Sequence, residues 1–143
     1  MSCSISASAV DSIRRHLVAE YPREGCGLLV GFEELGERIV EYAVPTRNAE
    51  RDPHRYSIAP EVFLAAEKAA RTQGLEVLGF FHSHPDLDPQ PSKSDVAKGW
   101  SHYTYLIVSV RGGEYRSMAA WRFGSGCFEP VPLRISQPSR ETR

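Results

Sequence analysis

The sequence predicts a single α/β domain, in which a mixed or mostly antiparallel sheet packs against two or three helices. Two stretches carry apolar or alanine-rich positions at helical spacing, and several short apolar runs alternate with turn residues in the manner of strands. The 143 residues suffice for one domain with a real core, without repeats or a linker. We expect the domain to span residues 1–135 and the polar residues 136–143 to form a frayed tail.

The first half of the chain predicts a helix followed by a β-hairpin. Residues 10–17 place Val, Ile and Leu at helical spacing, and Ser6 or Ser8 can cap this helix. Two apolar runs, 26–32 and 37–44, flank the polar turn EELG and predict the two strands of a hairpin.

A polar loop over residues 45–55 leads to a second helix. The segment 56–74 begins as a brief predicted strand and continues as a helix, with Pro60 in the first turn and Gly74 at the C-terminal cap. The run LEVLGFF (75–81) then predicts a central strand. The remaining elements are predicted as a short helix over 94–100 and strands over 103–110, 114–123 and 127–135.

Composition excludes several classes of function. The formal net charge is −1, and no run of Lys or Arg indicates a nucleic-acid or membrane surface. No apolar stretch is long enough to cross a bilayer, and the first residues lack the pattern of a signal peptide. Three widely spaced cysteines without a CxxC pair predict reduced thiols, so we expect a cytoplasmic protein.

The stretch FHSHPDLDPQPSKSD (81–95) contains the residues that carry chemistry. In extended backbone, His82 and His84 point to the same side of the strand, so both imidazoles can bind one metal ion. Asp95 is the best-placed carboxylate for a third ligand. Two simpler explanations remain open at this point: the histidines can be ordinary partly exposed residues, and Ser92 with Asp95 fits the S-x-x-D pattern of a helix cap.

This arrangement resembles the signature of the JAMM (MPN-plus) metalloproteases, over about residues 8 to 125. That family has an H-S-H-P sequence, then six residues, then S-x-x-D, with a glutamate upstream at the start of a strand. Asp86 and Asp88 lie outside the signature and are predicted to be loop acids. The matching residues of this chain are Glu24, His82, Ser83, His84, Pro85, Ser92 and Asp95.

The resemblance implies a fold and four roles. The fold is a curved, mostly antiparallel mixed sheet with two to three helices, of cytidine-deaminase-like architecture. His82, His84 and Asp95 would hold one Zn²⁺ per chain. Glu24 would act as general base for the attacking water and pass the proton to the leaving amine. Ser92 would donate a hydrogen bond to the oxyanion.

The resemblance also implies a substrate class. The chain lacks the long insertions of the eukaryotic deubiquitinases, so it looks like the small prokaryotic branch (Mec-type peptidases). These enzymes process ubiquitin-like sulfur-carrier proteins after a C-terminal Gly-Gly. Two alternatives are an isopeptidase that removes a ubiquitin-like modifier from lysine, and a non-catalytic MPN scaffold. The oligomeric state is not predicted.

Four further residues have open roles. Cys26, two positions after Glu24, is considered as a thiol nucleophile, but its apolar neighbours favour core packing. Packing is also favoured for Trp100. Arg47 and Asn48 lie in the loop before the second helix, where they are candidates for lining a cleft.

Overall fold

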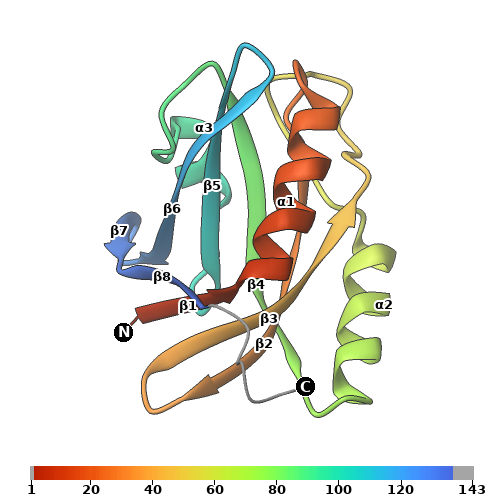
Figure 1. Cartoon of the computed structure of the whole chain (residues 1–143), viewed down its shortest axis with the longest axis vertical. Helices are drawn as coiled ribbons and strands as arrows, with labels where there is room; N and C mark the ends of the chain where they lie inside the picture. Colours follow the sequence, from red (N-terminus) through yellow and green to blue (C-terminus); the bar gives the residue numbers. More distant parts are fainter. Residues whose placement is uncertain (1, 137–143) are drawn as a thin grey trace.

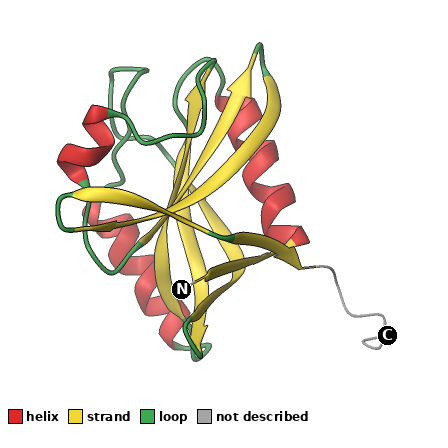
Figure 2. Cartoon of the chain, turned by 90° about the vertical axis from the view of Figure 1, so that its left-hand side faces the viewer, coloured by secondary structure: helices red, strands yellow, loops and turns green. Residues whose placement is uncertain are grey.

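The computed structural model describes residues 2–136, which form one eight-stranded sheet with helices on both of its faces (Figures 1 and 2). None of the helices in this range has the length and apolar character needed to cross a membrane. The elements in chain order are β1 (Ser2–Ser6), α1 (Ala7–Glu20), β2 (Cys26–Glu34), β3 (Glu37–Thr46), α2 (Pro60–Arg71), β4 (Glu76–Pro85), α3 (Lys93–Lys98), β5 (Thr104–Arg111), β6 (Glu114–Gly124), β7 (Cys127–Val131) and β8 (Leu133–Ser136).

The sheet is mixed and curled, as the sequence predicts. Its strand order is β7-β6-β5-β4-β2-β3-β1-β8. The pairs β1–β3, β1–β8 and β4–β5 are parallel, and the four other neighbouring pairs are antiparallel. The two edge strands, β7 and β8, are separated in the chain only by Pro132. The sheet must therefore curl until its two edges approach each other at this residue.

The first helix begins where its cap predicts. Ser6 accepts a hydrogen bond from Ala9 N (3.1 Å), so it is Ser6 rather than Ser8 that caps α1. The buried face of the helix includes Ile13 and Leu17, which are fully enclosed against the sheet. Because these positions recur at helical spacing, one face of α1 can pack against the sheet while the other remains in solvent.

Alternation along β2 and β4 directs side chains to two different cores. Leu29 and Phe81 belong to the core under α1, whereas Leu28 and Phe80 belong to the core under α2. The two long helices lie on opposite sides of the sheet (Figure 2). Phe80 faces the α2 side of the sheet. Because side chains alternate along a strand, His82 and His84 face the same side.

The strands differ from the prediction in three places. The strand β1 (Ser2–Ser6) was not predicted, because the mostly polar run SCSIS becomes a strand only through its two neighbours, β3 and β8. The brief strand expected at the start of 56–74 is a loop, because this segment pairs with no strand. The strand expected over 127–135 is two strands, interrupted at Pro132, which pair with opposite edges of the sheet.

The expected tail over 136–143 begins one residue too early, since Ser136 is the last residue of β8. Ser136 pairs with Ser6 of β1, and its hydroxyl donates to the carbonyl of Ile5 (3.4 Å). Residues 137–143 lie outside the described residues, so the expectation for them is untested.

Candidate metal centre and active site

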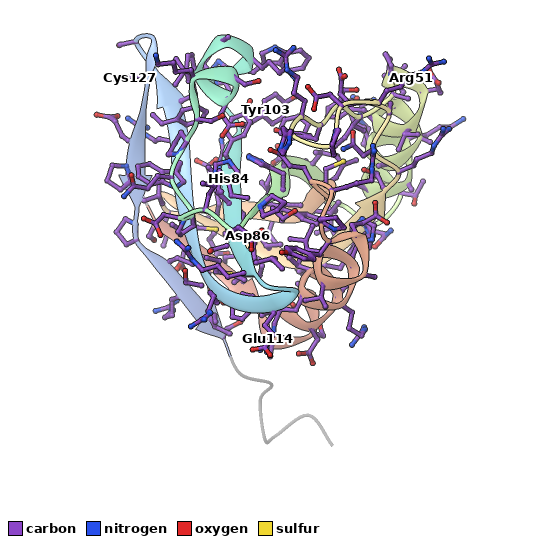
Figure 3. The ribbon with its side chains drawn as sticks, turned by 90° about the horizontal axis from the view of Figure 1, so that it is seen from above. Arg51, His84, Asp86, Tyr103, Glu114 and Cys127 are labelled. Carbon is purple, nitrogen blue, oxygen red and sulfur yellow. The ribbon has the colours of Figure 1, made fainter. Side chains whose placement is uncertain are left out.

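Two histidines of β4 form the centre of the site. His82 and His84 point to one side of the strand and are buried, with 0% and 3% of their surface exposed. Their Nε2 atoms lie 3.2 Å apart. The strand continues to Pro85, so the pair lies within it and not after its end. In the view from above, His84 lies inside the molecule, away from Arg51 and Cys127 at opposite sides (Figure 3).

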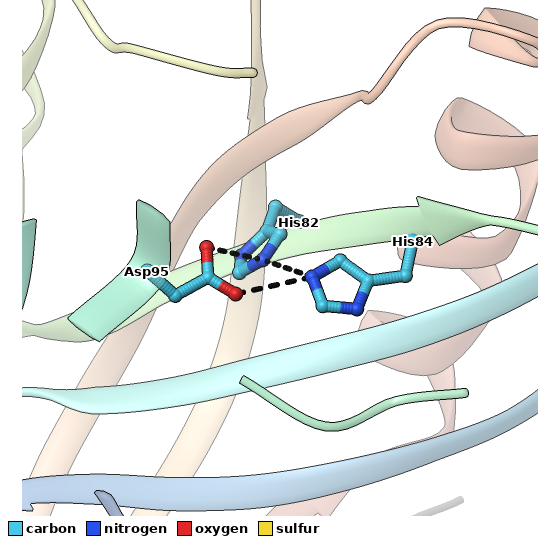
Figure 4. Close-up of side chains that lie close together, drawn as sticks. All are labelled: His82, His84 and Asp95. Atoms are coloured by element: carbon cyan, nitrogen blue, oxygen red, sulfur yellow. Dashed lines mark hydrogen bonds and ion pairs between the residues drawn. The ribbon is translucent and has the colours of Figure 1, made fainter. Parts of the chain in front are cut away.

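Asp95 completes a group of three side chains. The loop after β4 turns back, so that α3 begins beside the histidines (Figure 4). The Oδ1 atom of Asp95 lies 3.3 Å from Nε2 of His82, and Oδ2 lies 3.1 Å from Nε2 of His84. A capping box fixes this carboxylate, because Ser92 N donates to Oδ2 (2.8 Å) and Asp95 N donates to Ser92 Oγ (3.1 Å).

The two imidazoles and the carboxylate lie close enough together to hold one tetrahedral zinc ion. Atoms bound at about 2.0–2.1 Å from a tetrahedral metal lie about 3.3–3.4 Å from one another. The two Nε2 atoms lie 3.2 Å apart, and each lies close to one oxygen of Asp95: His82 Nε2 is 3.3 Å from Oδ1, and His84 Nε2 is 3.1 Å from Oδ2. Two imidazoles and one carboxylate also leave one coordination position open, as in catalytic zinc sites. The structure therefore brings together His82, His84 and Asp95 in a geometry that suits this metal.

A backbone hydrogen bond determines which nitrogen of His84 faces the metal position. Nδ1 of His84 lies 3.0 Å from the carbonyl oxygen of Asp88, which can only accept. Nδ1 therefore carries the proton, and Nε2 presents its lone pair. Asp88 contributes its backbone here, while its carboxylate pairs with Arg111 (2.6 Å). By contrast, Nδ1 of His82 is buried and has no hydrogen-bond partner within residues 2–136.

Burial and Asp95 together determine the protonation of the group. Burial lowers the pKa of His82. Burial acts in the same direction on His84, but hydrogen bonds to Asp95 and Asp88 outweigh it and raise the pKa. Burial alone would raise the pKa of Asp95, yet hydrogen bonds from both histidines hold it far below its usual range. Asp95 therefore stays ionised, which is the state that binds a metal.

Glu24 lies in the connection between α1 and β2, beside the strand that carries the histidines. Its amide donates to Pro53 O (2.9 Å), and its carbonyl accepts from Asn48 Nδ2 (2.9 Å). The next residue, Gly25, exchanges two hydrogen bonds with Ser83: Gly25 N donates to Ser83 Oγ (2.9 Å), and Ser83 N donates to Gly25 O (3.0 Å). The segment of the predicted base is thus attached to β4 between the two histidines.

The surroundings of Glu24 favour a protonated carboxyl group. Burial raises its pKa from 4.5 to about 8, while the charge of His84 lowers it and the charge of Asp95 raises it. Both residues belong to the ligand group, so the Glu24 carboxyl lies near enough to this group to interact with it electrostatically. A carboxyl group that titrates near neutral pH can both accept and release a proton there, as a general base and acid must.

We expect Glu24→Gln to stabilise the metal-free protein, and to do so increasingly as the pH rises. The unfolded chain ionises Glu24 near pH 4.5, whereas the folded chain keeps the proton up to about pH 8. The folded state therefore binds more protons in this window, and its stability falls with rising pH until about pH 8. One pKa unit is about 1.4 kcal/mol, so with solvent screening the difference should reach roughly 2–4 kcal/mol.

Urea unfolding of the metal-free wild type and Glu24→Gln, from about pH 4 to about pH 9, measures this difference. The two proteins should have similar stability at the acidic end and diverge above it. A stability difference that does not change with pH would contradict the raised pKa of Glu24.

Ser92 is the N-cap of α3, which was the alternative explanation for the S-x-x-D pattern. Its Oγ accepts a hydrogen bond from Asp95 N. A hydroxyl group has one donor and two acceptor positions, so capping leaves the O–H proton free to donate. No group within residues 2–136 accepts a hydrogen bond from this hydroxyl. Capping is therefore compatible with a donor role towards a substrate.

An apolar pocket of about 580 Å³ lies next to the candidate metal centre. Tyr56 connects the two, because it lines the pocket and its ring stacks on the ring of His82 with centroids 4.4 Å apart. Trp100 and Leu64 line it and remain 60% and 61% exposed. The Trp100 ring packs against the rings of Phe80 and Tyr103, in line with the expected packing role, and its exposed part forms a wall of the pocket. An apolar segment of a substrate can bind here beside the ligands.

Two residues make contacts near the site that the sequence did not predict: Tyr56, for which no role was expected, and Asn48, which was a candidate only for lining a cleft. Tyr56 stacks on His82, and Asn48 donates hydrogen bonds to the carbonyls of Glu24 (2.9 Å) and Arg55 (2.8 Å). These contacts depend on how the loop after β3 folds back over the sheet. A single sequence contains no periodic signal for such a fold.

Cys26 is a packing residue and not a nucleophile. Its side chain is fully buried, and burial raises the pKa of its thiol to about 11. The thiolate that would attack a substrate is therefore not formed at neutral pH. Its sulfur lies 3.5 Å from the hydroxyl of Thr46. Cys3, Cys26 and Cys127 are all free thiols, as the sequence predicts.

The chain has relatives with named activities. A desampylase from Haloferax volcanii is 36% identical over 115 residues, covering 76% of this chain and 81% of the relative. A probable TtuB-protein conjugate cleaving protease from Thermus thermophilus is 34% identical over 104 residues, covering 72% of this chain and 67% of the relative. A CysO-cysteine peptidase from Mycobacterium tuberculosis is 27% identical over 132 residues, covering 92% of this chain and 89% of the relative.

The fold also has a solved counterpart. The crystal structure of a JAB1/MPN domain protein from Archaeoglobus fulgidus superposes with a TM-score of 0.63 at 18% identity, covering 95% of this chain and 99% of that chain. Residues 6–124 match the family described as prokaryotic homologs of the JAB domain. Because this match covers most of its length, the chain belongs to the prokaryotic JAB-domain family. Since its relatives include peptidases and a desampylase, it is a hydrolase of the JAMM type.

Proposed function

We propose that the chain is a zinc-dependent peptidase that hydrolyses the amide bond after the C-terminal Gly-Gly of a small ubiquitin-like sulfur-carrier protein. The observation that carries this proposal is the convergence of His82, His84 and Asp95 beside the protonatable carboxyl of Glu24. The relatives named for CysO-cysteine and for TtuB-protein conjugates support the substrate class.

The burial of the ligands supports a substrate that ends in glycine. Because His82 and His84 expose almost none of their surface, only a narrow segment of a substrate can bring its carbonyl to the metal position. Glycine has no side chain to obstruct this approach. The apolar pocket next to the ligands can bind less narrow residues of the same segment. The three free cysteines suit a cytoplasmic location, which we include in the proposal.

The proposed mechanism is the addition of water to the scissile carbonyl, followed by rupture of its C–N bond. A bound zinc ion supplies Lewis acidity, which lowers the pKa of water towards about 7 and polarises a carbonyl. Glu24 accepts the proton of the attacking water and delivers it to the leaving amine. The hydroxyl of Ser92 donates to the oxygen that gains negative charge, because its proton is not used by the helix cap. Asp95 remains ionised throughout, which is the state in which a carboxylate can act as the third ligand.

Ser92→Ala is expected to lower kcat/KM by about 10²–10³-fold, the usual effect of losing an oxyanion donor. It should also cost about 1 kcal/mol of stability because the cap of α3 is lost. Ser92→Gly separates the two effects, since glycine replaces a serine cap at a cost of only a few tenths of a kcal/mol. Steady-state kinetics and urea unfolding should therefore find both variants slow but only Ser92→Ala clearly destabilised. Full activity in Ser92→Gly would restrict Ser92 to capping.

A second candidate is an isopeptidase that removes a ubiquitin-like protein from a lysine side chain. The relative named as a TtuB-protein conjugate cleaving protease favours it, because a conjugate joins two proteins. The same residues would act on both bonds. The two functions differ only in the leaving amine, which is an α-amino group in one case and a lysine Nε in the other.

Two substrates made from one carrier separate these candidates. In the first, cysteine is attached through its α-amino group to the terminal glycine, and in the second, a lysine peptide is attached through Nε. Mass spectrometry of each reaction with the zinc-loaded protein gives kcat/KM for both bonds. We expect faster release of cysteine, whereas faster release of the lysine peptide would establish the second candidate. A protein that cleaves unrelated peptides and leaves both adducts intact would refute both.

A further inference from the structure

We propose that Tyr56 is a positioning residue for His82. Its ring, and not a hydrogen bond, holds the His82 imidazole in the orientation that presents Nε2 to the metal. The inference rests on the metal centre of the proposed function, but it does not depend on which bond the protein cleaves. It also connects the pocket to the ligands, because Tyr56 belongs to both.

His82 lacks the anchor that a metal-binding histidine usually has. In most metal sites the second ring nitrogen donates to a carbonyl or carboxylate, which fixes both the tautomer and the tilt of the ring. His84 follows this rule through the carbonyl of Asp88 (3.0 Å). The Nδ1 atom of His82 is buried without such a partner among the described residues. Another contact must therefore determine how the His82 ring is oriented.

The ring of Tyr56 supplies this contact. The two ring planes are inclined by only 20°, with centroids 4.4 Å apart. At this distance the rings are in face-to-face contact, so that rotation of the imidazole about its Cβ–Cγ bond would drive it into the tyrosine ring. A flat wall on one side of His82 thus restricts the ring to orientations close to the observed one. The Nε2 atom then remains 3.2 Å from Nε2 of His84.

Tyr56 can restrict the His82 ring because hydrogen bonds fix the backbone of the residues before and after Tyr56. Asn48, with 8% of its surface exposed, donates from Nδ2 to Arg55 O (2.8 Å). Its Oδ1 accepts from Ser57 N (3.1 Å). One buried amide thus binds the residues directly before and after Tyr56. The same Nδ2 also donates to the carbonyl of Glu24 (2.9 Å), so Asn48 positions both the proposed base and the tyrosine.

The helix of the third ligand holds Tyr56 as well. Lys98 lies one turn after Asp95 in α3, and its Nζ donates to the carbonyl of Tyr56 (3.0 Å). The same ammonium group lies 5.7 Å from the centroid of the tyrosine ring, within the range of a cation–π contact. Helix α3 therefore supplies one ligand directly and supports the ring that orients another.

The structure predicts that the ring and not the hydroxyl of Tyr56 is needed. Within residues 2–136 the Tyr56 hydroxyl makes no hydrogen bond, while its ring face covers His82. Phenylalanine offers the same ring face, whereas leucine fills much of the space without a flat surface. A Tyr56→Phe protein should therefore behave as the wild type, and Tyr56→Leu should behave as Tyr56→Ala.

The test is the affinity of each purified protein for Zn²⁺, measured by competition with a chromophoric chelator. We expect Tyr56→Ala and Tyr56→Leu to raise the Kd for Zn²⁺ by about 10-fold or more, as loss of an outer partner of a metal-binding histidine typically does. Tyr56→Phe should keep the wild-type Kd. The visible absorption of the Co²⁺-loaded proteins provides a second readout, because it responds to the ligand geometry and should change only in the Ala and Leu variants.

Trp100→Ala is the matched control. Trp100 is an aromatic residue of the same pocket, but its ring contacts Phe80 and Tyr103 and not His82. Its removal should leave the Kd for Zn²⁺ and the Co²⁺ spectrum unchanged. If Tyr56→Ala fails to fold by circular dichroism, the comparison of Tyr56→Leu with Tyr56→Phe decides the question.

Wild-type affinity in a folded Tyr56→Leu protein would overturn the inference. A Tyr56→Phe protein as weak as Tyr56→Ala would also overturn it, because the hydroxyl would then be the important group. Failure of the proposed function is a different result: the wild type would bind Zn²⁺ with the expected dependence on Tyr56 and still leave both carrier adducts intact.

Discussion

His82→Ala is expected to abolish stoichiometric zinc binding, and Asp95→Ala is expected to do the same. Each removes one of the three proposed ligands, whose nitrogen and oxygen atoms contact one another at 3.1–3.3 Å. The loss should exceed the roughly 10–100-fold weakening that follows removal of an outer hydrogen-bond partner. Elemental analysis after dialysis should find about one zinc per wild-type chain and almost none in either variant. Hydrolysis of a carrier adduct should fall to the uncatalysed rate.

Asp88→Ala is the matched control for these variants. Asp88 lies in the loop between the ligands, but its carboxylate is exposed and pairs with Arg111, and only its backbone carbonyl reaches His84. The substitution leaves this carbonyl in place, so zinc should remain near one per chain. Retention of a full zinc ion by His82→Ala would mean that the ligand set is wrong. Loss of zinc from Asp88→Ala would mean that the Asp88 side chain also contributes to zinc binding.

Glu24→Gln is expected to lower kcat by about 10²–10⁴-fold, the usual contribution of a general base. The amide has nearly the shape of the carboxyl group but cannot accept the proton of water. Since Glu24 does not belong to the ligand group, zinc content should stay at the wild-type value. Rapid-quench or steady-state kinetics on a carrier adduct, with zinc measured in the same sample, provide the test.

Two comparisons make this result specific. Glu41→Gln, the same change at an exposed acid of β3, should leave the rate unchanged. The metal-free Glu24→Gln protein should be more stable than the wild type above pH 4.5, because burial raises the pKa of Glu24 to about 8. A slow variant that is also more stable cannot owe its slowness to unfolding. An active Glu24→Gln protein that holds zinc would assign the base to another group.

The local chemistry of the site is largely predictable from its sequence. The alternation of side chains along a strand is sufficient to place His82 and His84 on one side of β4. The S-x-x-D pattern is sufficient to place Asp95 at the start of a helix, where the capping box now holds it. Capping does not exclude the proposed ligand role of Asp95, because the oxygen that accepts from Ser92 N also lies 3.1 Å from Nε2 of His84.

Contacts between distant segments are not predictable in this way. The position of Tyr56 on His82 depends on the loop after β3, which Asn48 holds through hydrogen bonds to four different backbone groups. The sequence around Tyr56 and around Asn48 contains no motif that predicts these contacts. The strand β1 is another example: its residues have weak strand character, and two partner strands make them a strand.

The pairing of β1 has a consequence for synthesis of the chain on the ribosome. β1 is made first, but it pairs on one side with β8, so that Cys3 lies opposite Leu133. The nascent chain can form the β2–β3 hairpin early, whereas the outer edge of β1 stays unpaired until the four residues of β8 emerge. The residues proposed for catalysis are all synthesised before that moment. The sheet is thus completed only after all its other strands have been made, and until then an open strand edge is available to other chains.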